Sequence, residues 1–327
     1  MTARRVLVTG AGGFIGSHLV EALVARGDTV RAMVRYNARG DLGHLADIAP
    51  AARGAVEVVS GDITDPVFTR ASARGCEVVF HLAALIAIPY SYRAPYQVFG
   101  TNCVGTVNVA QACLDEGVDR MIHTSTSEVY GTAQTVPISE SHPLVGQSPY
   151  AASKIAADQA VESFRRAFGL RAVTVRPFNT YGPRQSARAV LPTIVTQALA
   201  RGSIKLGSLT PTRDLNFVAD TARGFVLAAE VDDALGRTLN LATGKEVSIG
   251  DLAARVLRAL GKDLPVESDD RRVRPAQSEV ERLCGDASLA RAVLGWAPTV
   301  SLDEGVARVI DYVRANPGRY RPDEYAT

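Results

Sequence analysis

Two short stretches of the sequence carry side chains that can act together on one small molecule. The first stretch contains Thr126, Ser127 and Glu128, and the second contains Tyr150 and Lys154. Tyr150 and Lys154 are four residues apart, so on a helix both side chains lie on the same face. An ammonium group beside a phenol favours the phenolate, which is a base, and a nearby carboxylate can remove a second proton. The two stretches therefore predict a catalytic site for proton abstraction.

The surrounding sequence indicates which elements position these residues. A buried strand is expected over residues 120–125, directly before the first stretch. Ser148 and Pro149 are typical of the N-cap and first position of a helix, which we expect over 150–168 with its end at Gly169. Ligands of doubly wound sheets bind beyond the C-terminal strand ends, where both stretches would then lie. The alternative is a structural strand end followed by an ordinary amphipathic helix.

A glycine-rich turn near the N-terminus indicates a dinucleotide site. Gly10, Gly13 and Gly16 lie between an expected strand over residues 4–9 and an expected helix over 14–26. The first glycine permits a tight turn, the second lets the backbone approach a pyrophosphate, and the third lets the helix pack close to the sheet. The N–H groups at the helix start can bind the phosphates. A glycine turn without a ligand is the alternative interpretation.

The ends of the next strands supply further predicted contacts to the cofactor. After a strand over 29–34, the usual ribose-binding acid is absent and Arg35 can pair with a 2′-phosphate, which favours NADP over NAD. Arg35 can equally lie on the adenine or point to solvent. Asp62, after a strand over 56–60, can bind the adenine amino group or simply close its turn, and small residues follow a fourth strand over 77–81. The predicted cofactor contacts are Gly10, Gly13, Phe14, Ile15, Gly16, Arg35, Asp62, Ile63, Leu82, Ala83, Ala84, Tyr150 and Lys154.

The alternation of strands and helices predicts an α/β fold with a Rossmann-type, doubly wound parallel sheet. Residues 1–176 are expected to form the NAD(P)-binding domain, and a late strand near 238–242 is expected to return to it. Residues 177–327 are expected to form a smaller C-terminal α+β lobe that mainly binds the substrate. Further expected elements are a strand over 170–176 and helices over 95–117, 191–201, 249–260 and 286–294.

Polar residues in the second half of the chain are candidates for binding a charged substrate. Asn179 can offer its amide to a phosphate, and Arg213 and Arg274 can hold a diphosphate. Arg184 or Arg188 can bind the carboxylate of a uronate substrate. For Arg213 and Arg274, a solvated side chain is the alternative.

The composition argues against several other classes of protein. The chain has 327 residues, of which 46% are hydrophobic, and a net charge of +2, which implies no strong attraction to nucleic acid or membrane. Its apolar runs are too short to cross a bilayer and its start leaves no room for a signal peptide, so we expect a cytoplasmic protein. The four cysteines form no C-x-x-C pair and no His/Cys/Asp cluster has metal-ligand spacing, so we expect no metal. The second apolar faces of the helices over 95–117 and 150–168 suit a homodimer, although both can also belong to the core.

Several ordered motifs resemble those of one enzyme family. The glycine turn over 9–16, the Tyr150/Lys154 pair, the segment over 176–183 and Arg274 with its following proline together resemble the extended short-chain dehydrogenase/reductase family. More narrowly, the chain is similar to the NAD(P)-dependent nucleotide-sugar epimerases and dehydratases. This resemblance covers nearly the whole chain.

Within that family, the segment over 126–131 is similar to sugar-nucleotide 4,6-dehydratases of the GDP-mannose and UDP-N-acetylglucosamine type. Epimerases usually have a small neutral residue where Glu128 stands, whereas the dTDP-glucose dehydratases usually have an aspartate in place of Ser127. The resemblance implies a tightly bound NAD(P)+ and a nucleotide-sugar substrate linked to UDP, GDP or dTDP.

The chemistry implied for a hexose nucleotide is a transient oxidation at C4. Tyr150 would remove the C4 hydroxyl proton with help from Lys154 and Thr126, and Glu128 would then remove the acidified C5 proton. Water would leave from C6 with help from Glu128 or Ser127, which gives a 4-keto-6-deoxy sugar. A UDP-glucuronate decarboxylase, an NDP-sugar 4-epimerase and a non-enzymatic dinucleotide sensor are the alternatives.

Overall fold

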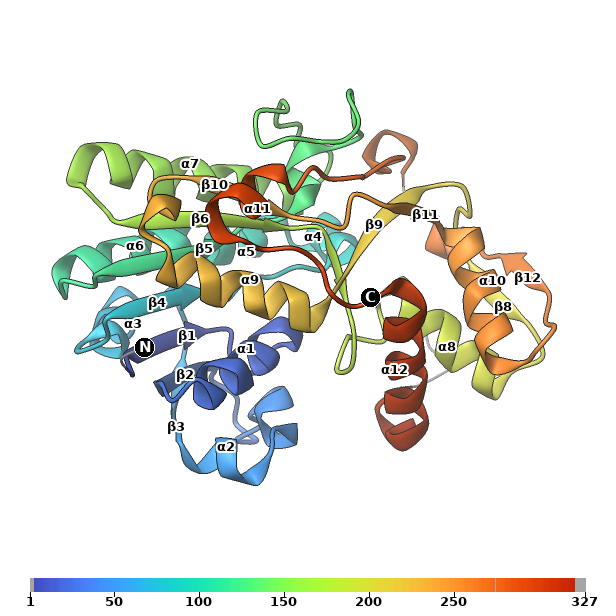
Figure 1. Ribbon diagram of the computed structural model, residues 1–327, viewed down its shortest axis with the longest axis horizontal. Coiled ribbons are helices and arrows are strands. Elements are labelled where there is room, and N and C mark those ends of the chain that lie inside the picture. The colour runs from blue at the N-terminus through green and yellow to red at the C-terminus, as the bar shows by residue number, and fades with distance from the viewer. Residues whose placement is uncertain (1–2, 274, 321–327) are drawn as a thin grey trace.

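The computed structural model describes residues 3–273 and 275–320, and its larger part is built on a seven-stranded sheet (Figure 1). The strands follow the order β10-β6-β5-β4-β1-β2-β3, and every neighbouring pair is parallel. The predicted α/β doubly wound fold is therefore confirmed. The strand bounds are β1 (Arg5–Thr9), β2 (Thr29–Arg35), β3 (Val56–Gly61), β4 (Val78–His81), β5 (Arg120–Thr124), β6 (Ala172–Pro177) and β10 (Thr238–Leu241).

The order of the strands brings chemically important segments to one edge of the sheet. β2 and β3 lie on one side of β1, whereas β4, β5 and β6 lie on the other, so the direction of the winding reverses at β1. The register aligns the strand ends, since Thr9 pairs with His81 and His81 pairs with His123. The loops that follow β1, β4 and β5 therefore meet at the C-terminal edge.

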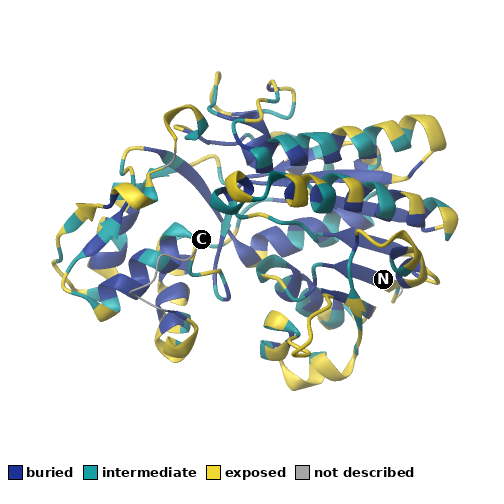
Figure 2. Ribbon diagram, turned by 180° about the vertical axis from the view of Figure 1, so that it is seen from behind, coloured by how far each residue is buried: buried dark blue, intermediate teal, exposed yellow. Residues whose placement is uncertain are grey.

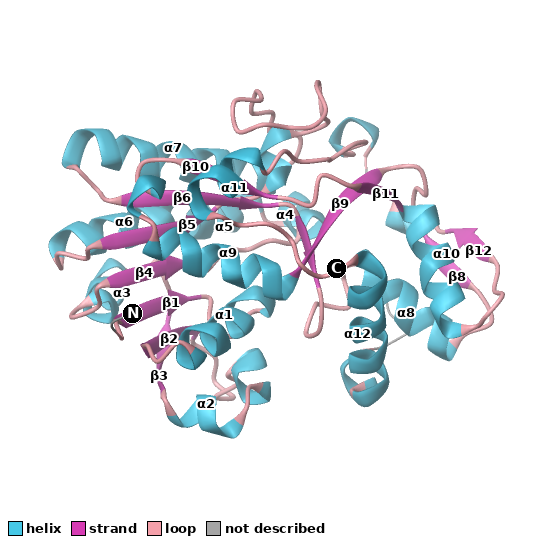
Figure 3. Cartoon of the chain, viewed as in Figure 1, coloured by secondary structure: helices cyan, strands magenta, loops and turns pink. Residues whose placement is uncertain are grey.

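Helices cover both faces of this sheet (Figure 3). α1 (Phe14–Ala25) and α9 (Val218–Glu230) pack side by side on one face, and α3 (Pro66–Ala73), α6 (Gly105–Asp115) and α7 (Pro149–Phe168) pack on the other. Val6 and Val8 of β1 belong to the core beneath α1 and α9, whereas Leu7 belongs to the core beneath α6. Because successive strand residues point to opposite faces, a sheet covered on both sides needs apolar residues at every position.

Shorter helices join these elements. α4 (Ile88–Arg93) and α5 (Pro95–Phe99) precede a π-helical turn over Gly100–Val104, which leads directly into α6. The expected single helix over 95–117 is thus interrupted. The remaining short helices of this part are α2 (Pro50–Gly54) and α11 (Ser288–Leu294).

The smaller part has its own apolar core, which is formed chiefly by α8 (Val190–Ala200), α10 (Ile249–Leu260) and α12 (Leu302–Ala315). Two small sheets accompany these helices, and Figure 2 shows that the inward sides of both parts are buried. The chain returns to the large sheet through α9 and β10 before it forms α10. The strands of the small sheets are β7 (Asn179–Tyr181), β9 (Thr212–Phe217), β11 (Glu246–Ser248), β8 (Ile204–Leu206) and β12 (Val266–Ser268).

None of the helices in the described ranges has both the length and the apolar character needed to cross a bilayer.

Candidate active site

Helix α7 presents Tyr150 and Lys154 at the C-terminal edge of the sheet. The helix begins where the sequence indicates, because the Ser148 side chain accepts a hydrogen bond from the Ala151 N–H and Pro149 occupies the first turn. It ends at Gly169, whose φ of 73° is left-handed. Tyr150 is 7% exposed and Lys154 is 3% exposed, so both polar groups act in a protected environment.

The segment after β5 brings the predicted Thr126 and Glu128 to the same place. Thr126 is the N-cap of a short 3-10 helix over Ser127–Tyr130, and its hydroxyl accepts a hydrogen bond of 3.2 Å from the Glu128 N–H. The Thr126 hydroxyl also forms a hydrogen bond with the Tyr150 phenol. Ser127 and Glu128 are buried beside it. The two stretches that the sequence singled out are thus one cluster.

Burial dominates the electrostatics of the Tyr–Lys pair in the protein alone. It raises the pKa of Tyr150, the charge of Glu128 raises it further, and the bond from Thr126 lowers it. Burial also lowers the pKa of Lys154 to about 8, against the opposing charge of Asp158. The Lys154 ammonium donates a hydrogen bond of 2.6 Å to the carbonyl oxygen of Thr124.

The glycine turn between β1 and α1 leaves no room for side chains. Gly10 has a φ of 70°, and a Cβ atom there would lie 2.7 Å from the Ala83 nitrogen. A Cβ atom at Gly16 would lie 2.3 Å from the Gly10 carbonyl oxygen. Gly13 is the N-cap of α1, and no side chain caps this helix, so its first N–H groups, including those of Phe14 and Ile15, are available for an anion. This backbone fits a dinucleotide pyrophosphate.

Thr9 and His81 fix the loop that follows β4. The Thr9 hydroxyl accepts bonds of 3.2 Å from the Leu82 and Ala83 N–H groups, and it bonds to Nδ1 of His81 at 2.9 Å. Nε2 of His81 bonds to Thr106 at 2.9 Å. His81 is thus a structural residue that positions the predicted cofactor contacts over residues 82–84.

The predicted adenosine contacts lie at the ends of β2 and β3. Arg35 Nε is 3.8 Å from a carboxylate oxygen of Asp62, and both side chains are exposed. Asp62 also accepts bonds of 2.9 Å from the Thr64 N–H and hydroxyl groups, so it does close its turn. Ile63 is buried against Gly105 of α6.

Asn102 is a functional candidate that the sequence did not reveal. It lies in the π-helical turn, where its amide bonds to both the N–H (2.8 Å) and the carbonyl (3.0 Å) of Leu85. The same amide donates a bond of 2.9 Å to Ser153, which donates in turn to the Tyr150 carbonyl. π-helical turns recur at functional sites, and here the turn ties the loop after β4 to the catalytic helix.

The predicted substrate residues differ in their surroundings. The Asn179 amide oxygen is buried and lacks a hydrogen-bond partner among the described residues. Arg213 lies on β9, donates to the Thr212 carbonyl and forms an ion pair of 3.1 Å with Glu279. Arg274 lies outside the described residues.

Arg184, like Arg213, is buried and paired with a carboxylate of the chain. Its guanidinium donates two bonds, of 2.7 and 3.0 Å, to the carboxylate of Glu21 on α1 and a third to Ser17. Its φ of 70° is unusual for a residue other than glycine. The arginine thus joins the segment after β7 to α1 through its two terminal nitrogens.

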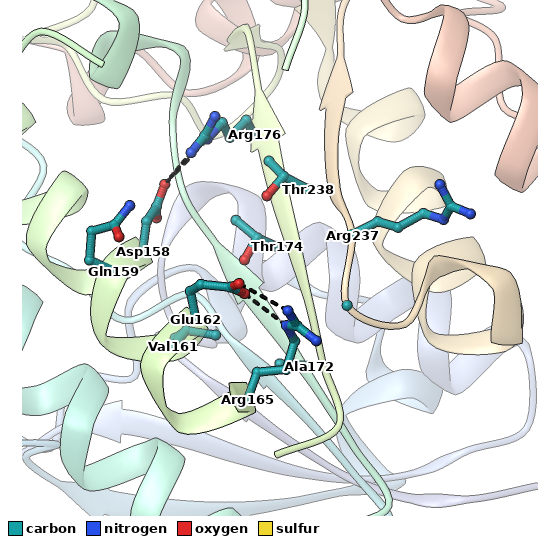
Figure 4. Close-up of a pocket in the computed structure, with 11 residues that line it drawn as sticks. Asp158, Gln159, Val161, Glu162, Arg165, Ala172, Thr174, Arg176, Arg237 and Thr238 are labelled. Atoms are coloured by element: carbon teal, nitrogen blue, oxygen red, sulfur yellow. Dashed lines mark hydrogen bonds and ion pairs between the residues drawn. The ribbon is translucent and has the colours of Figure 1, made fainter. Parts of the chain in front are cut away.

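A hollow of about 100 Å³ lies beside the catalytic helix, and Figure 4 shows its lining. It is bounded by the C-terminal half of α7 and by residues of β6 and β10, with Asp158 and Arg176 on its wall. Tyr150, Lys154 and Glu128 do not line it, so this hollow is separate from the candidate catalytic cluster. In the described ranges, no group of three or more His, Cys, Asp or Glu side chains is placed to hold a metal ion.

A doubly wound sheet, a glycine turn after β1 and a Tyr–Lys pair on the helix that follows β5 define a short-chain dehydrogenase/reductase. Residues 7–309 match the family described as GDP-mannose 4,6 dehydratase. The chain belongs to the extended short-chain dehydrogenase/reductase family of nucleotide-sugar epimerases and dehydratases.

Relatives of both reaction types are similar to this chain over nearly its full length. A UDP-glucose 4-epimerase of Mycolicibacterium smegmatis is 37% identical over 95% of this chain and 98% of its own. A dTDP-glucose 4,6-dehydratase of Actinoplanes sp. is 32% identical over 95% and 98%. The crystal structure of a dTDP-glucose 4,6-dehydratase from Streptomyces venezuelae, with NAD bound, has a TM-score of 0.87 at 31% identity and covers 97% of this chain and 99% of that one.

Proposed function

We propose that this protein is a nucleotide-sugar 4,6-dehydratase that converts an NDP-hexose or NDP-N-acetylhexosamine to its 4-keto-6-deoxy product. The observation that carries the proposal is the buried carboxylate of Glu128, whose charge acts on the Tyr150 phenol and whose backbone is held by Thr126. A base for the C4 hydroxyl and a second base for C5–H are the two groups that elimination requires.

The cofactor of the proposed reaction is NAD(P)+. The glycine turn over residues 10–16 and the start of α1 fit its pyrophosphate, since a Cβ atom there would collide with backbone. Tyr150, Lys154 and the loop over 82–84 would hold the nicotinamide half. When bound, the cofactor supplies a hydride acceptor for C4, a hydride donor for C6 and a positive charge beside the phenol.

The chain's own residues move the protons. Tyr150 takes the C4 hydroxyl proton, and Thr126 bonds to the same oxygen. The C4 ketone makes C5–H acidic, and Glu128 removes this proton. The C6 hydroxyl then leaves as water after it receives this proton from Glu128, directly or through Ser127, and the proton that Tyr150 took passes to C5, which returns Tyr150 to its starting form. Tyr150, Ser127 and Glu128 are buried, which limits the access of bulk water to the reacting atoms.

Arg213 and Asn179 are proposed to bind the nucleotide diphosphate, together with Arg274. An arginine and a buried amide suit phosphate oxygens. We also propose residues 1–176 as the cofactor domain and 177–327 as the main substrate lobe, with α9 and β10 returning to the large sheet. The exposed guanidinium of Arg35 supports NADP over NAD, and titration with each cofactor tests this preference by comparing their dissociation constants.

A 4-epimerase is the second candidate, because the 37% identical relative is a UDP-glucose 4-epimerase. A UDP-glucuronate decarboxylase remains a further alternative: of the two arginines predicted to bind its C6 carboxylate, Arg184 is paired with Glu21, whereas Arg188 is exposed.

The deciding experiment is incubation of the purified protein with UDP-, GDP- and dTDP-linked sugars, followed by mass spectrometry. Loss of one water from a hexose or N-acetylhexosamine nucleotide is expected and would name the substrate. Loss of carbon dioxide from UDP-glucuronate would replace the proposal with the decarboxylase. An unchanged mass with a shifted retention time would replace it with the epimerase.

We further propose a homodimer formed through α5, α6 and α7. Tyr96, Phe99 and Val104 leave apolar side chains exposed along α5 and the π-helical turn, and Tyr96 is 92% exposed. Sedimentation analysis tests the proposal, since Tyr96→Glu is expected to give a monomer whereas Phe168→Glu, at the far end of α7, is expected to remain a dimer.

A further inference from the structure

Asp158 continues the face of α7 that carries Tyr150 and Lys154. It lies one helical turn after the lysine and is 5% exposed. Its carboxylate accepts a hydrogen bond of 3.0 Å from Nε2 of His123 on β5 and one of 2.8 Å from the Ser125 hydroxyl. These bonds tie the catalytic helix to the strand end that leads directly into Thr126.

Arg176 of β6 completes the surroundings of this carboxylate. Its Nε and one terminal nitrogen donate to the same Asp158 oxygen at 3.2 and 2.9 Å, as Figure 4 shows for the ion pair. Its other terminal nitrogen donates to the Tyr130 hydroxyl, which donates to Asn240 on β10. A buried network therefore runs from the catalytic helix across three neighbouring strands.

Asp158 supplies a negative charge near the Tyr–Lys pair. Burial lowers the pKa of His81 and of His123, which favours the neutral form of both histidines. Asp158 raises the pKa of Lys154, in opposition to burial. The titratable and charged groups that act on Tyr150 and Lys154 are Asp158 on α7, Glu128 in the 3-10 helix, His81 on β4 and His123 on β5. Arg176 on β6 acts on Asp158.

We propose that Asp158 is a positioning residue for the reaction: it fixes the end of β5 beneath Tyr150, and its charge keeps Lys154 as an ammonium ion. The proposal rests on the proposed function for its kinetic part. Its electrostatic part concerns the protein alone, because a buried ammonium ion needs a nearby negative charge to persist. Lys154 also bonds to β5, at the Thr124 carbonyl, whereas Asp158 bonds to both β5 and β6.

The composition of the chain makes the titration of Lys154 directly measurable. The sequence has only four lysines, Lys154, Lys205, Lys245 and Lys262, so selective isotope labelling gives four side-chain signals. The Lys154 signal is assigned with the variant Lys154→Met, in whose spectrum it is missing. In the wild-type protein we expect its titration near pH 8. In Asp158→Asn we expect it about one pH unit lower or more, as for the loss of a neighbouring opposite charge.

The kinetic part is measured on the wild type's own substrate. In Asp158→Asn, the alkaline limit of kcat/KM should move downward with the titration of Lys154. A purely structural role would lower kcat at every pH and leave that limit in place, which would overturn the proposal. If the wild type converts no nucleotide sugar, the proposed function fails, yet the titration still decides the electrostatic part.

Asp220→Asn is the matched control. Asp220 is also a buried carboxylate with an arginine partner, Arg223, but it lies on α9 and accepts bonds from Thr299. The variant Asp220→Asn is expected to lower the melting temperature without changing the pH at which Lys154 titrates. If Asp158→Asn does not fold, Asp158→Glu is measured instead and should keep the titration near pH 8 while lowering kcat. A shifted titration in Asp158→Glu, or a wild-type Lys154 that is neutral at pH 7, would overturn the proposal.

Discussion

Replacement of Glu128 by glutamine separates the two halves of the proposed reaction. Glutamine keeps the shape of the side chain, and the backbone bond from the Glu128 N–H to Thr126 is unaffected. The change removes one negative charge beside Tyr150, and that charge raises the pKa of the phenol. The variant should therefore remove the C4 hydroxyl proton at least as readily as the wild type. Removal of C5–H, in contrast, loses its base.

The size of the effect follows from the role of a general base. Such a group contributes about 10²- to 10⁴-fold to its step. This range corresponds to about 3 to 5 kcal/mol of activation free energy. We expect the elimination to slow by this factor, whereas C4 oxidation continues and reduced cofactor accumulates. A sugar-nucleotide 4-epimerase would show no such division, because its reaction does not involve C5–H.

The assay is mass spectrometry of the sugar nucleotide after reaction in deuterium oxide. The wild-type product should lack one water and carry one solvent deuterium at C5, and Glu128→Gln should form it far more slowly. Glu140→Gln is the control, since Glu140 is a partly buried carboxylate that instead accepts a bond from the Asn240 N–H. Dehydration by Glu128→Gln at the wild-type rate would refute the assigned role of this carboxylate.

Three further changes test the cofactor turn, the lysine and the substrate lobe. Gly16→Ala should destabilise the fold by about 1–3 kcal/mol and weaken NAD(P) binding, because its Cβ atom would lie 2.3 Å from a backbone oxygen. Gly54→Ala is the control, since its Cβ atom would meet nothing within 4 Å. Thermal unfolding with and without cofactor measures the loss of stability and the loss of binding. In the wild type, kcat/KM should fall above about pH 8 as Lys154 loses its proton. Over the same range, this group's contribution to stability should rise, because its pKa is lower in the folded protein than in the unfolded chain; a pH profile beside melting temperatures checks both signs. Arg213→Ala should raise KM for the nucleotide sugar about tenfold or more with little change in kcat, in line with the loss of one charged hydrogen bond; steady-state kinetics would contradict this by showing an unchanged KM.

Elements with local start and stop signals were predictable from the sequence. α7 has a capping serine, a proline in its first turn and a left-handed glycine at its end, and α10 was expected over the residues that it occupies. α9 was not predicted, because it begins directly after β9 and no side chain caps it. α12 was also missed, although Ser301 caps it and acidic residues fill its first turn.

The hydrogen bonds that hold the site together could not be predicted, because they join residues far apart in the sequence. The periodicity over 95–117 indicated one helix, and a π-helical turn inserts no sequence signal of its own. That turn directs Asn102 to Leu85 and to Ser153, which are 17 and 51 residues away. The network of Asp158 likewise depends on the register of β5, β6 and β10, which only the assembled sheet defines.

The length of a side chain determines how well its partners can be predicted from the sequence. Thr126, Glu128 and Tyr150 meet because their backbones lie at adjacent element ends, and short or rigid side chains leave little choice of partner. An arginine reaches much farther, and Arg184 uses that reach to bind Glu21, 163 residues earlier in the chain. The reaction type can therefore be argued from residues whose positions are fixed by the fold. The identity of the sugar nucleotide depends on arginines, and the fold alone does not determine which partners these arginines bind. A panel of substrates is for this reason more informative about specificity than any single arginine variant.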